Sequence, residues 1–210
     1  EYANKLSSLG IDAKTSDIIT SVSLTIDYLN RENSGKRVFV IGERYLQETL
    51  LNAGYSCANT PEETDVVIVS LDRNLDYGKI HFAYRAVREG AHIVATNPDM
   101  ICPMDEGEIV DAGAWIAALE ALIKQPISDV MGKPSARCAE VVLAGLDCLP
   151  ENALMVGDRL ETDIRMAVES GMRSGLVLSG VSDVSDVDRS DYQPDFVWES
   201  VANIPEALGL

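Results

Sequence analysis

The sequence lacks long apolar runs, paired cysteines and a signal region. No apolar run reaches the ~18 residues that a membrane-spanning helix needs, and the opening residues, Glu-Tyr-Ala-Asn-Lys, carry no apolar signal. The four cysteines form no C-x-x-C pair and do not cluster with the two histidines, which argues against a zinc site. Dispersed thiols and the absence of targeting signals predict a soluble cytoplasmic protein that does not bind membranes.

Basic residues are also few: 17 lysines and arginines stand against 34 aspartates and glutamates, for a formal net charge of −17. Such a surface repels DNA, RNA and anionic lipid, so no nucleic-acid partner is expected. An anionic substrate would need a site where the sign of the charge is reversed. A bound cation together with a lysine supplies this most simply.

Short β-branched apolar runs alternate with amphipathic helical stretches, which predicts an α/β fold with largely parallel sheets. Two breaks in this pattern stand at residues 33–36 and at Pro126. The stretch between them, residues 34–126, has the size and pattern of a small α/β domain. We therefore predict one domain formed by residues 1–33 and 127–210, with residues 34–126 inserted into it.

The apolar pattern also predicts the individual elements. Strands are expected at residues 17–21, 37–41, 65–71, 92–95, 129–131, 153–157, 175–179 and 196–198. Helices are expected at residues 1–9, 23–31, 45–53, 77–89, 113–124, 134–146, 163–170 and 204–208. A long loop rich in Asn, Asp, Pro and Gly is expected at residues 96–111.

A lysine in a strand-to-helix connection is the first candidate for chemistry. Lys133 follows a predicted strand and precedes a helix that Pro134 would open at its first position. The carboxyl end of a sheet, beside the positive end of a helix, favours an anion such as phosphate. The alternative is a solvated loop lysine without a ligand.

Two aspartates follow the next predicted strand. Asp158 comes directly after Gly157 at the strand's carboxyl end, and Asp163 opens the next helix. Helix capping and bonds to nearby backbone are the alternative explanation for both. One helix and one strand separate Lys133 from Asp158, so a right-handed βαβ step would bring both to the same edge of one sheet. A lysine and two carboxylates there suit Mg²⁺ with a phosphate.

These motifs lead to a family. Gly132-Lys133-Pro134, followed by G-D-R-L-E-T-D at residues 157–163, resembles the third and fourth motifs of haloacid dehalogenase (HAD) superfamily phosphatases. Residues 94–99, 111–113 and 176–180 resemble the branch that includes nitrophenylphosphatases and NagD-like proteins. The resemblance implies a HAD-like Rossmannoid core with an inserted α/β (type II) cap.

The resemblance implies Mg²⁺-dependent hydrolysis of small phosphate monoesters through an aspartyl-phosphate intermediate. Lys133 would be catalytic and bind the phosphate, Asp158 would bind Mg²⁺, and Asp163 would order the metal site without binding the ion directly. The partner would be a small phosphorylated metabolite, and caps of this kind commonly support homodimers.

The long loop at residues 96–111 belongs to the cap in this comparison. It would face the core site and help to choose the leaving group, with Asn97, Asp99 and Asp111 as the candidate specificity residues. The alternative is a loop whose polar side chains bond to its own backbone.

The family's first two motifs are missing from these 210 residues. The closest string to the nucleophile motif D-x-D-G-T is D-V-S-D-V-D at residues 183–188, which we interpret as a polar loop. We therefore expect the chain to be part of a longer protein and inactive alone. We also expect the strands ending at Asp158 and Ser179 to expose unpaired edges.

Two other functions are compatible with the same motifs. The chain could be a non-catalytic relative that binds phosphate or regulates another protein, having kept the pocket without the nucleophile. It could also transfer phosphoryl groups to an acceptor other than water, because motifs shared by a whole superfamily do not separate hydrolysis from transfer.

Overall fold

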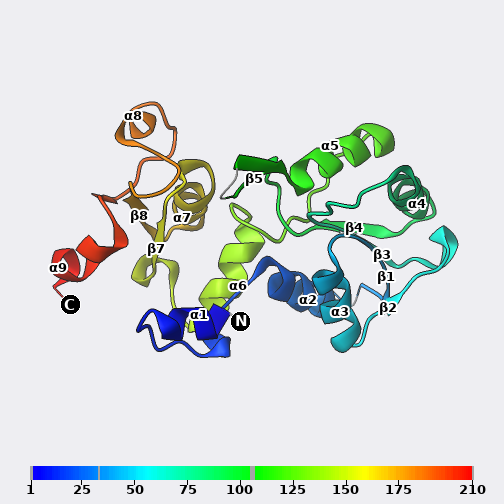
Figure 1. The fold of residues 1–210 in the computed structure, drawn as a ribbon, viewed down its shortest axis with the longest axis horizontal. Helices are drawn as coiled ribbons and strands as arrows, with labels where there is room; N and C mark the ends of the chain where they lie inside the picture. The colour runs from blue at the N-terminus through cyan, green and yellow to red at the C-terminus, as the bar shows by residue number, and fades with distance from the viewer. Residues whose placement is uncertain (1, 33, 105–106, 210) are drawn as a thin grey trace. The chain divides into compact units, whose positions relative to one another are not determined.

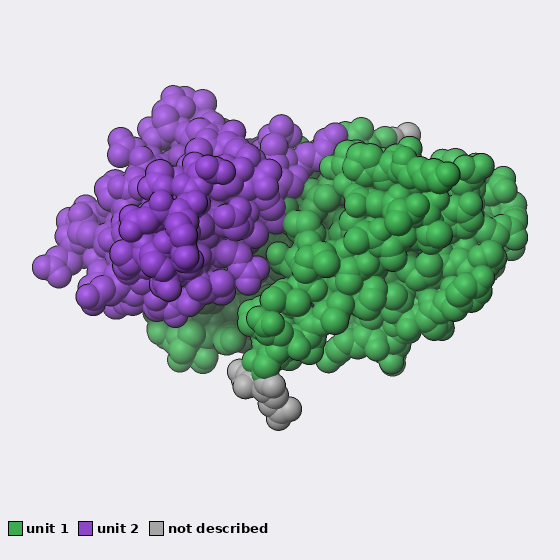
Figure 2. All heavy atoms as spheres, turned by 90° about the horizontal axis from the view of Figure 1, so that it is seen from above, with its two compact units in different colours: residues 1–132 green, residues 133–210 purple. Residues whose placement is uncertain are grey.

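The computed structural model describes residues 2–32, 34–104 and 107–209. The chain divides into two compact units at the Gly132–Lys133 peptide bond, one N-terminal (Glu1–Gly132) and one C-terminal (Lys133–Leu210) (Figure 2). Both contain parallel sheets flanked by helices, which confirms the α/β, HAD-like fold class. The assignment of residues 1–33 to one domain with residues 127–210 stays a prediction.

Figure 1 traces the order of the elements. The helices are α1 (Tyr2–Ser8), α2 (Ser21–Arg31), α3 (Arg44–Asn52), α4 (Tyr77–Arg88), α5 (Ala112–Ile123), α6 (Ala136–Leu146), α7 (Arg165–Ser170), α8 (Val184–Val187) and α9 (Ile204–Leu208). The strands are β1 (Arg37–Ile41), β2 (Ser56–Cys57), β3 (Val66–Val69), β4 (His92–Ala95), β5 (Ile101–Met104), β6 (Gly107–Val110), β7 (Leu154–Gly157), β8 (Arg173–Val177) and β9 (Phe196–Trp198). Within the described residues no helix is both long and apolar enough to cross a membrane.

The N-terminal unit is built on a parallel sheet with the order β2-β1-β3-β4. Strand β3 is buried along its whole length, as its run of consecutive apolar residues predicts. On one face Val67 and Val69 pack against Ala83 and Ala86 of α4 and Leu119 of α5. Figure 1 shows α4 and α5 on one side of this sheet and α2 and α3 on the other.

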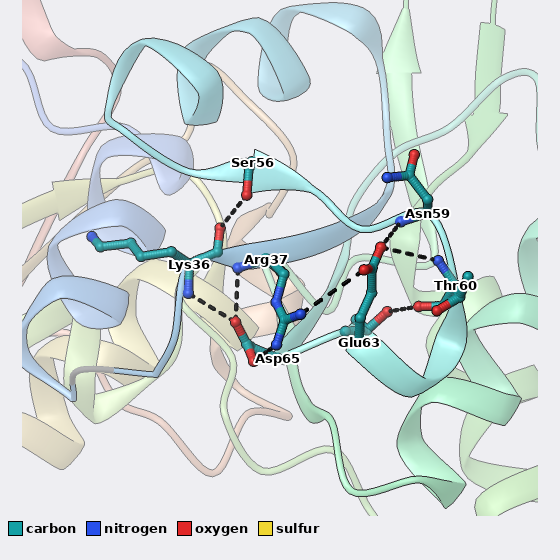
Figure 3. A network of polar contacts seen from close by, with 8 residues as sticks. Lys36, Arg37, Ser56, Asn59, Thr60, Glu63 and Asp65 are labelled. Atoms are coloured by element: carbon teal, nitrogen blue, oxygen red, sulfur yellow. Dashed lines mark hydrogen bonds and ion pairs between the residues drawn. The ribbon is translucent and has the colours of Figure 1, made fainter.

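Asp65 fixes the beginnings of β1 and β3. Its Oδ2 accepts hydrogen bonds from the backbone N–H groups of Lys36 (3.0 Å) and Arg37 (2.9 Å) (Figure 3). The Arg37 guanidinium lies 3.5 Å from Oδ1. These bonds, above all the one from the Arg37 backbone, lower the pKa of Asp65 because they stabilise the charged carboxylate.

Two predicted elements near these strands were wrong. Residues 96–111 do not form a plain loop, because β5 and β6 pair in an antiparallel hairpin inside them. Both strands are short and mostly exposed, so no buried alternation marks them in the sequence. Residues 17–21 are not a strand. Thr20 and Ser23 form reciprocal hydrogen bonds, a capping box that starts α2 at Ser21.

The strand expected at residues 129–131 forms only a single parallel bridge, and that bridge is to β4. Ala95 donates its N–H to the Asp129 carbonyl (2.9 Å), and Met131 donates to the Ala95 carbonyl (2.8 Å), on either side of Val130. The βαβ step that we predicted from this strand to β7 is therefore wrong. The choice of partner strand depends on the three-dimensional fold, and the local apolar pattern does not encode it.

The C-terminal unit carries a parallel sheet with the order β7-β8-β9. Leu176 of β8 packs with Leu160 and Ile164 in its core. No described strand pairs with the outer side of β7, and all of its residues are only half-buried, so an unpaired edge is present there as predicted. The same prediction is wrong for the strand predicted to end at Ser179, because β8 has a partner on each side.

Candidate functional site

A short ion pair in the C-terminal unit joins Lys133 to Asp163. The Lys133 ammonium donates to Asp163 Oδ1 at 2.6 Å, and the backbone N–H of Arg159 donates to Oδ2 at 3.2 Å. The Asp163 side chain is 3% exposed and that of Lys133 is 47% exposed. A buried carboxylate needs partners of this kind, and both of its oxygens have one.

Lys133 lies in the segment before α6 and not in the helix itself. Helix α6 begins at Ala136 with Ser135 as the N-cap residue, so Pro134 lies outside the helix. The prediction that Pro134 occupies the first helical position is wrong. The Lys133 ammonium is paired with Asp163, and Lys133 lies three residues before the first residue of α6.

Because Gly157 has no side chain, Asp163 can lie against the end of β7. A Cβ placed on Gly157, the last residue of β7, would collide with the Asp163 carboxylate. Asp163 belongs to a π-helical turn, Leu160–Ile164, that runs directly into α7. Such turns are rare and occur often at functional sites. Asp163 therefore lies in the turn that opens the helix, as predicted, and it lies against the strand end that leads to Asp158.

Asp158 follows Gly157 at the carboxyl end of β7, and a second loop holds it. The N–H of Val181 donates to Asp158 Oδ2 (3.0 Å), and the N–H of Ser182 donates to the Asp158 carbonyl (2.9 Å). Among the described residues, none donates a hydrogen bond to Asp158 Oδ1. Val181 and Ser182 were not singled out from the sequence. Their position after the neighbouring parallel strand, β8, is the signal that could have identified them.

These residues are compatible with a magnesium ion but not with a metal site made of protein ligands alone. Within the described parts of the chain, no three His, Cys, Asp or Glu side chains gather closely enough to hold a metal. Mg²⁺ binds through one or two carboxylates and completes its octahedron with water and phosphate oxygens. Asp158 Oδ1 offers one such ligand, and Lys133 offers a positive charge for phosphate.

Cys138 in α6 lies close enough to Lys133 for the positive charge of the lysine to affect the pKa of the Cys138 thiol. Burial raises the pKa of the Cys138 thiol, and the lysine only partly offsets this effect. Cys138 as a residue is 6% exposed. Cys138 is therefore a neutral packing residue beside the site, as expected for a buried cysteine.

The cap candidates contact one another and their own backbone. Asn97 Nδ2 donates to Asp111 Oδ2 (3.2 Å), and the backbone N–H of Ala112 donates to Asp111 Oδ1 (2.6 Å) at the start of α5. The Asp99 carbonyl accepts the N–H of Gly113 (2.7 Å). Asp111, 4% exposed, thus acts as a helix cap. Asn97 Oδ1 is buried and meets no hydrogen-bond donor in the described residues. A role of these residues in substrate choice stays a prediction.

Comparisons with known proteins agree with this fold and these motifs. Residues 130–204 match a HAD-hydrolase-like family, and residues 1–56 match the haloacid dehalogenase-like hydrolases. The chain is 33% identical to the sugar-phosphatase AraL of Bacillus subtilis, over 95% of this chain and 73% of that protein. It is 34% identical to the ribonucleotide monophosphatase NagD of Escherichia coli, over 97% of this chain and 79% of that protein.

Solved structures agree as well. A p-nitrophenyl phosphatase from Archaeoglobus fulgidus superposes with a TM-score of 0.91 at 29% identity, over 98% of this chain and 80% of that one. NagD from E. coli superposes with a TM-score of 0.83 at 33% identity, over 96% of this chain and 78% of that one. Fold, motifs and relatives together define a HAD-type phosphatase fold. The chain belongs to the HAD superfamily, in its branch of NagD-like and p-nitrophenylphosphatase-like hydrolases.

Proposed function

We propose that Lys133, Asp158 and Asp163 form the phosphate- and magnesium-binding part of a phosphatase site for small phosphate monoesters. The observation that carries this proposal is the Lys133–Asp163 ion pair, in which Asp163 also covers the end of the strand leading to Asp158. The sugar phosphatase and the ribonucleotide monophosphatase among the relatives support sugar phosphates and nucleoside monophosphates as the substrate class.

Each residue has a distinct role in this proposal. Lys133 carries three N–H donors, of which one goes to Asp163, and it offers the others to phosphate oxygens. Asp163 orients the lysine and balances its charge. Asp158 directs Oδ1 to the metal ion. A bound Mg²⁺ would neutralise negative charge on the phosphoryl group during transfer.

The family's nucleophile motif, D-x-D-G-T, does not occur in these 210 residues. The D-V-S-D-V-D string at residues 183–188 serves a structural purpose, because Asp183 accepts the N–H of Asp186 (3.1 Å) and caps helix α8. It is a short helix and not the polar loop that we predicted. We therefore expect this chain to bind phosphate and Mg²⁺ but to need an aspartate from outside the sequence for turnover.

The first test measures binding of inorganic phosphate in the presence of Mg²⁺, by calorimetry on the 210-residue chain. Lys133→Met should weaken phosphate binding about tenfold or more, because a charge-assisted contact is lost. Asp158→Asn should remove the Mg²⁺ dependence. Lys5→Met, on α1 of the other unit, serves as the charge-matched control. Equal phosphate affinity in Lys133→Met and Lys5→Met would refute the proposal.

A second assay, hydrolysis of p-nitrophenyl phosphate, addresses the nucleophile. No turnover by the 210-residue chain, checked by intact mass, supports the requirement for an outside aspartate. Mg²⁺-dependent turnover by that same chain would overturn it.

The missing nucleophile motif also favours a second candidate, a non-catalytic phosphate-binding or regulatory relative. Phosphoryl transfer to another acceptor is separated from hydrolysis by product analysis with competing alcohols.

A further inference from the structure

Two loops of the C-terminal unit are joined around Asp158. Besides the bonds from Val181 and Ser182 to Asp158, a third bond runs in the opposite direction: the N–H of Leu160 donates to Ser182 Oγ at 3.1 Å. The loop after β8 thus holds the Asp158 carbonyl, one Asp158 carboxylate oxygen and the backbone two residues further on. Two of these three bonds reach Asp158 itself, and both come from Val181 and Ser182, which the sequence motifs do not include.

The Ser182 hydroxyl makes this contact in a buried place. Ser182 is 7% exposed and Leu160 is 3% exposed, so water does not readily replace the hydroxyl as acceptor. Removing the hydroxyl would leave the Leu160 N–H unpaired inside the protein, which is unfavourable. The two loops would then separate, or the backbone from Asp158 to Leu160 would turn towards another acceptor.

Gly180 explains how the second loop approaches so closely. A Cβ on Gly180 would overlap the Asp158 side chain, including Oδ2. Gly180 does not have a positive φ, so its backbone conformation is open to other residues. The constraint is therefore steric: any side chain at this position would displace the Asp158 carboxylate itself.

We propose that the loop at residues 179–182 positions Asp158 for the metal ion, with Ser182 and Gly180 as the positioning residues. Val181 occupies Oδ2, which leaves Oδ1 as the oxygen for the cation and sets its direction. This inference rests on the proposed metal role of Asp158. Neither positioning residue is assigned a contact with the ion or the phosphate. They act by restricting one side chain, as partners of metal ligands commonly do.

The test is a Mg²⁺ titration of the 210-residue chain with inorganic phosphate present, followed by the backbone amide NMR signals near Asp158. Ser182→Ala should weaken Mg²⁺ binding about tenfold or more. Ser182→Thr, which keeps the hydroxyl, should retain most of the affinity. Gly180→Ala should weaken Mg²⁺ binding to a similar extent, because its new methyl group displaces the carboxylate.

Two controls in the same unit match these changes. Ser170→Ala removes a buried hydroxyl that has no hydrogen-bond partner among the described residues. Gly145→Ala adds a methyl group where no atom outside its own helix and chain neighbours lies within 4 Å. Both should leave Mg²⁺ affinity unchanged. Thermal unfolding of every variant separates a metal effect from a general loss of stability.

The outcomes separate this inference from the proposed function. If Asp158→Asn binds Mg²⁺ as tightly as the unchanged chain, the metal assignment fails and this inference fails with it. If Asp158→Asn loses Mg²⁺ binding while Ser182→Ala and Gly180→Ala keep it, only the positioning role is overturned. A lower melting temperature in Ser182→Ala with unchanged Mg²⁺ affinity would likewise assign Ser182 a purely structural role.

Discussion

We predict that the two partners of the Lys133–Asp163 ion pair differ in how much their replacement lowers the free energy of unfolding. Among the described residues, Lys133→Met leaves the buried Asp163 carboxylate with the backbone N–H of Arg159 as its one donor, whereas Asp163→Asn leaves a lysine that water can reach. Removing one partner of a fully buried pair costs about 3–5 kcal/mol, but the lysine here is 47% exposed, so we expect about 1–3 kcal/mol for Lys133→Met. Asp163→Asn should cost less.

A double-mutant cycle tests this reasoning directly. The double variant should be more stable than the sum of the single effects predicts, with a coupling energy of about 1–3 kcal/mol. The chain has two tryptophans, one in each unit, so urea unfolding of the C-terminal unit can be followed through Trp198 after Trp115→Phe. This reporter separates the C-terminal transition from that of the other unit.

An exposed pair of the same length provides the control. Arg44 Nε and Glu48 Oε1 also lie 2.6 Å apart, but their side chains are 88% and 52% exposed. Their coupling, followed through Trp115 after Trp198→Phe, should be about 0.3–0.5 kcal/mol. A coupling energy for Lys133–Asp163 no larger than this would show that burial of Asp163 adds nothing, and the reasoning would be refuted.

Three further predictions follow from burial and hydrogen bonding. A thiol-alkylating reagent at pH 8 should modify the exposed Cys57 quickly and Cys138 slowly, because burial raises the pKa of Cys138; mass spectrometry of the modified peptides gives both rates, and equal rates would contradict this. Hydrogen bonds from Ser174 lower the pKa of Asp195, so the stability that this carboxylate contributes is fully present above its unfolded pKa and is lost as the pH falls through its folded pKa. The cost of Asp195→Asn to unfolding free energy should therefore be larger at pH 7 than below about pH 4, and a pH-independent cost would contradict this. Leu119→Ala in the N-terminal core should cost about 2–5 kcal/mol in urea unfolding, and a cost under about 1 kcal/mol would show that the site collapses around the smaller residue.

Local patterns predicted the elements that have clear boundaries. The strands at residues 37–41, 92–95 and 196–198 and the helix at residues 204–208 coincide with β1, β4, β9 and α9, because short apolar or capped runs mark them. Strand β2, Ser56–Cys57, was missed since two exposed residues carry no such pattern. Which strands pair with one another was predicted least well, because strand pairing depends on contacts between residues distant in sequence.

In the candidate site, too, the sequence identified residues but not the contacts between distant parts of the chain. Residue type and strand position were enough to select Lys133, Asp158 and Asp163, and the structure brings the first and last of these together. The route by which we expected them to meet was wrong, since Val130 pairs with β4. Ser182 escaped selection because its role depends on a contact between two loops, which no spacing in the sequence reveals.

The two glycines that face the aspartates have a consequence for how this site can change during evolution. Gly157 has no room for a side chain because Asp163 fills the space, and Gly180 has none because Asp158 does. Each glycine is therefore restricted by a carboxylate rather than by its own backbone angles. If either aspartate were replaced by a residue with a shorter side chain, the glycine that faces it could be replaced by a larger residue. If Asp158 and Asp163 serve the metal site that we propose, paired replacement at these positions would record the loss of that function in a descendant sequence.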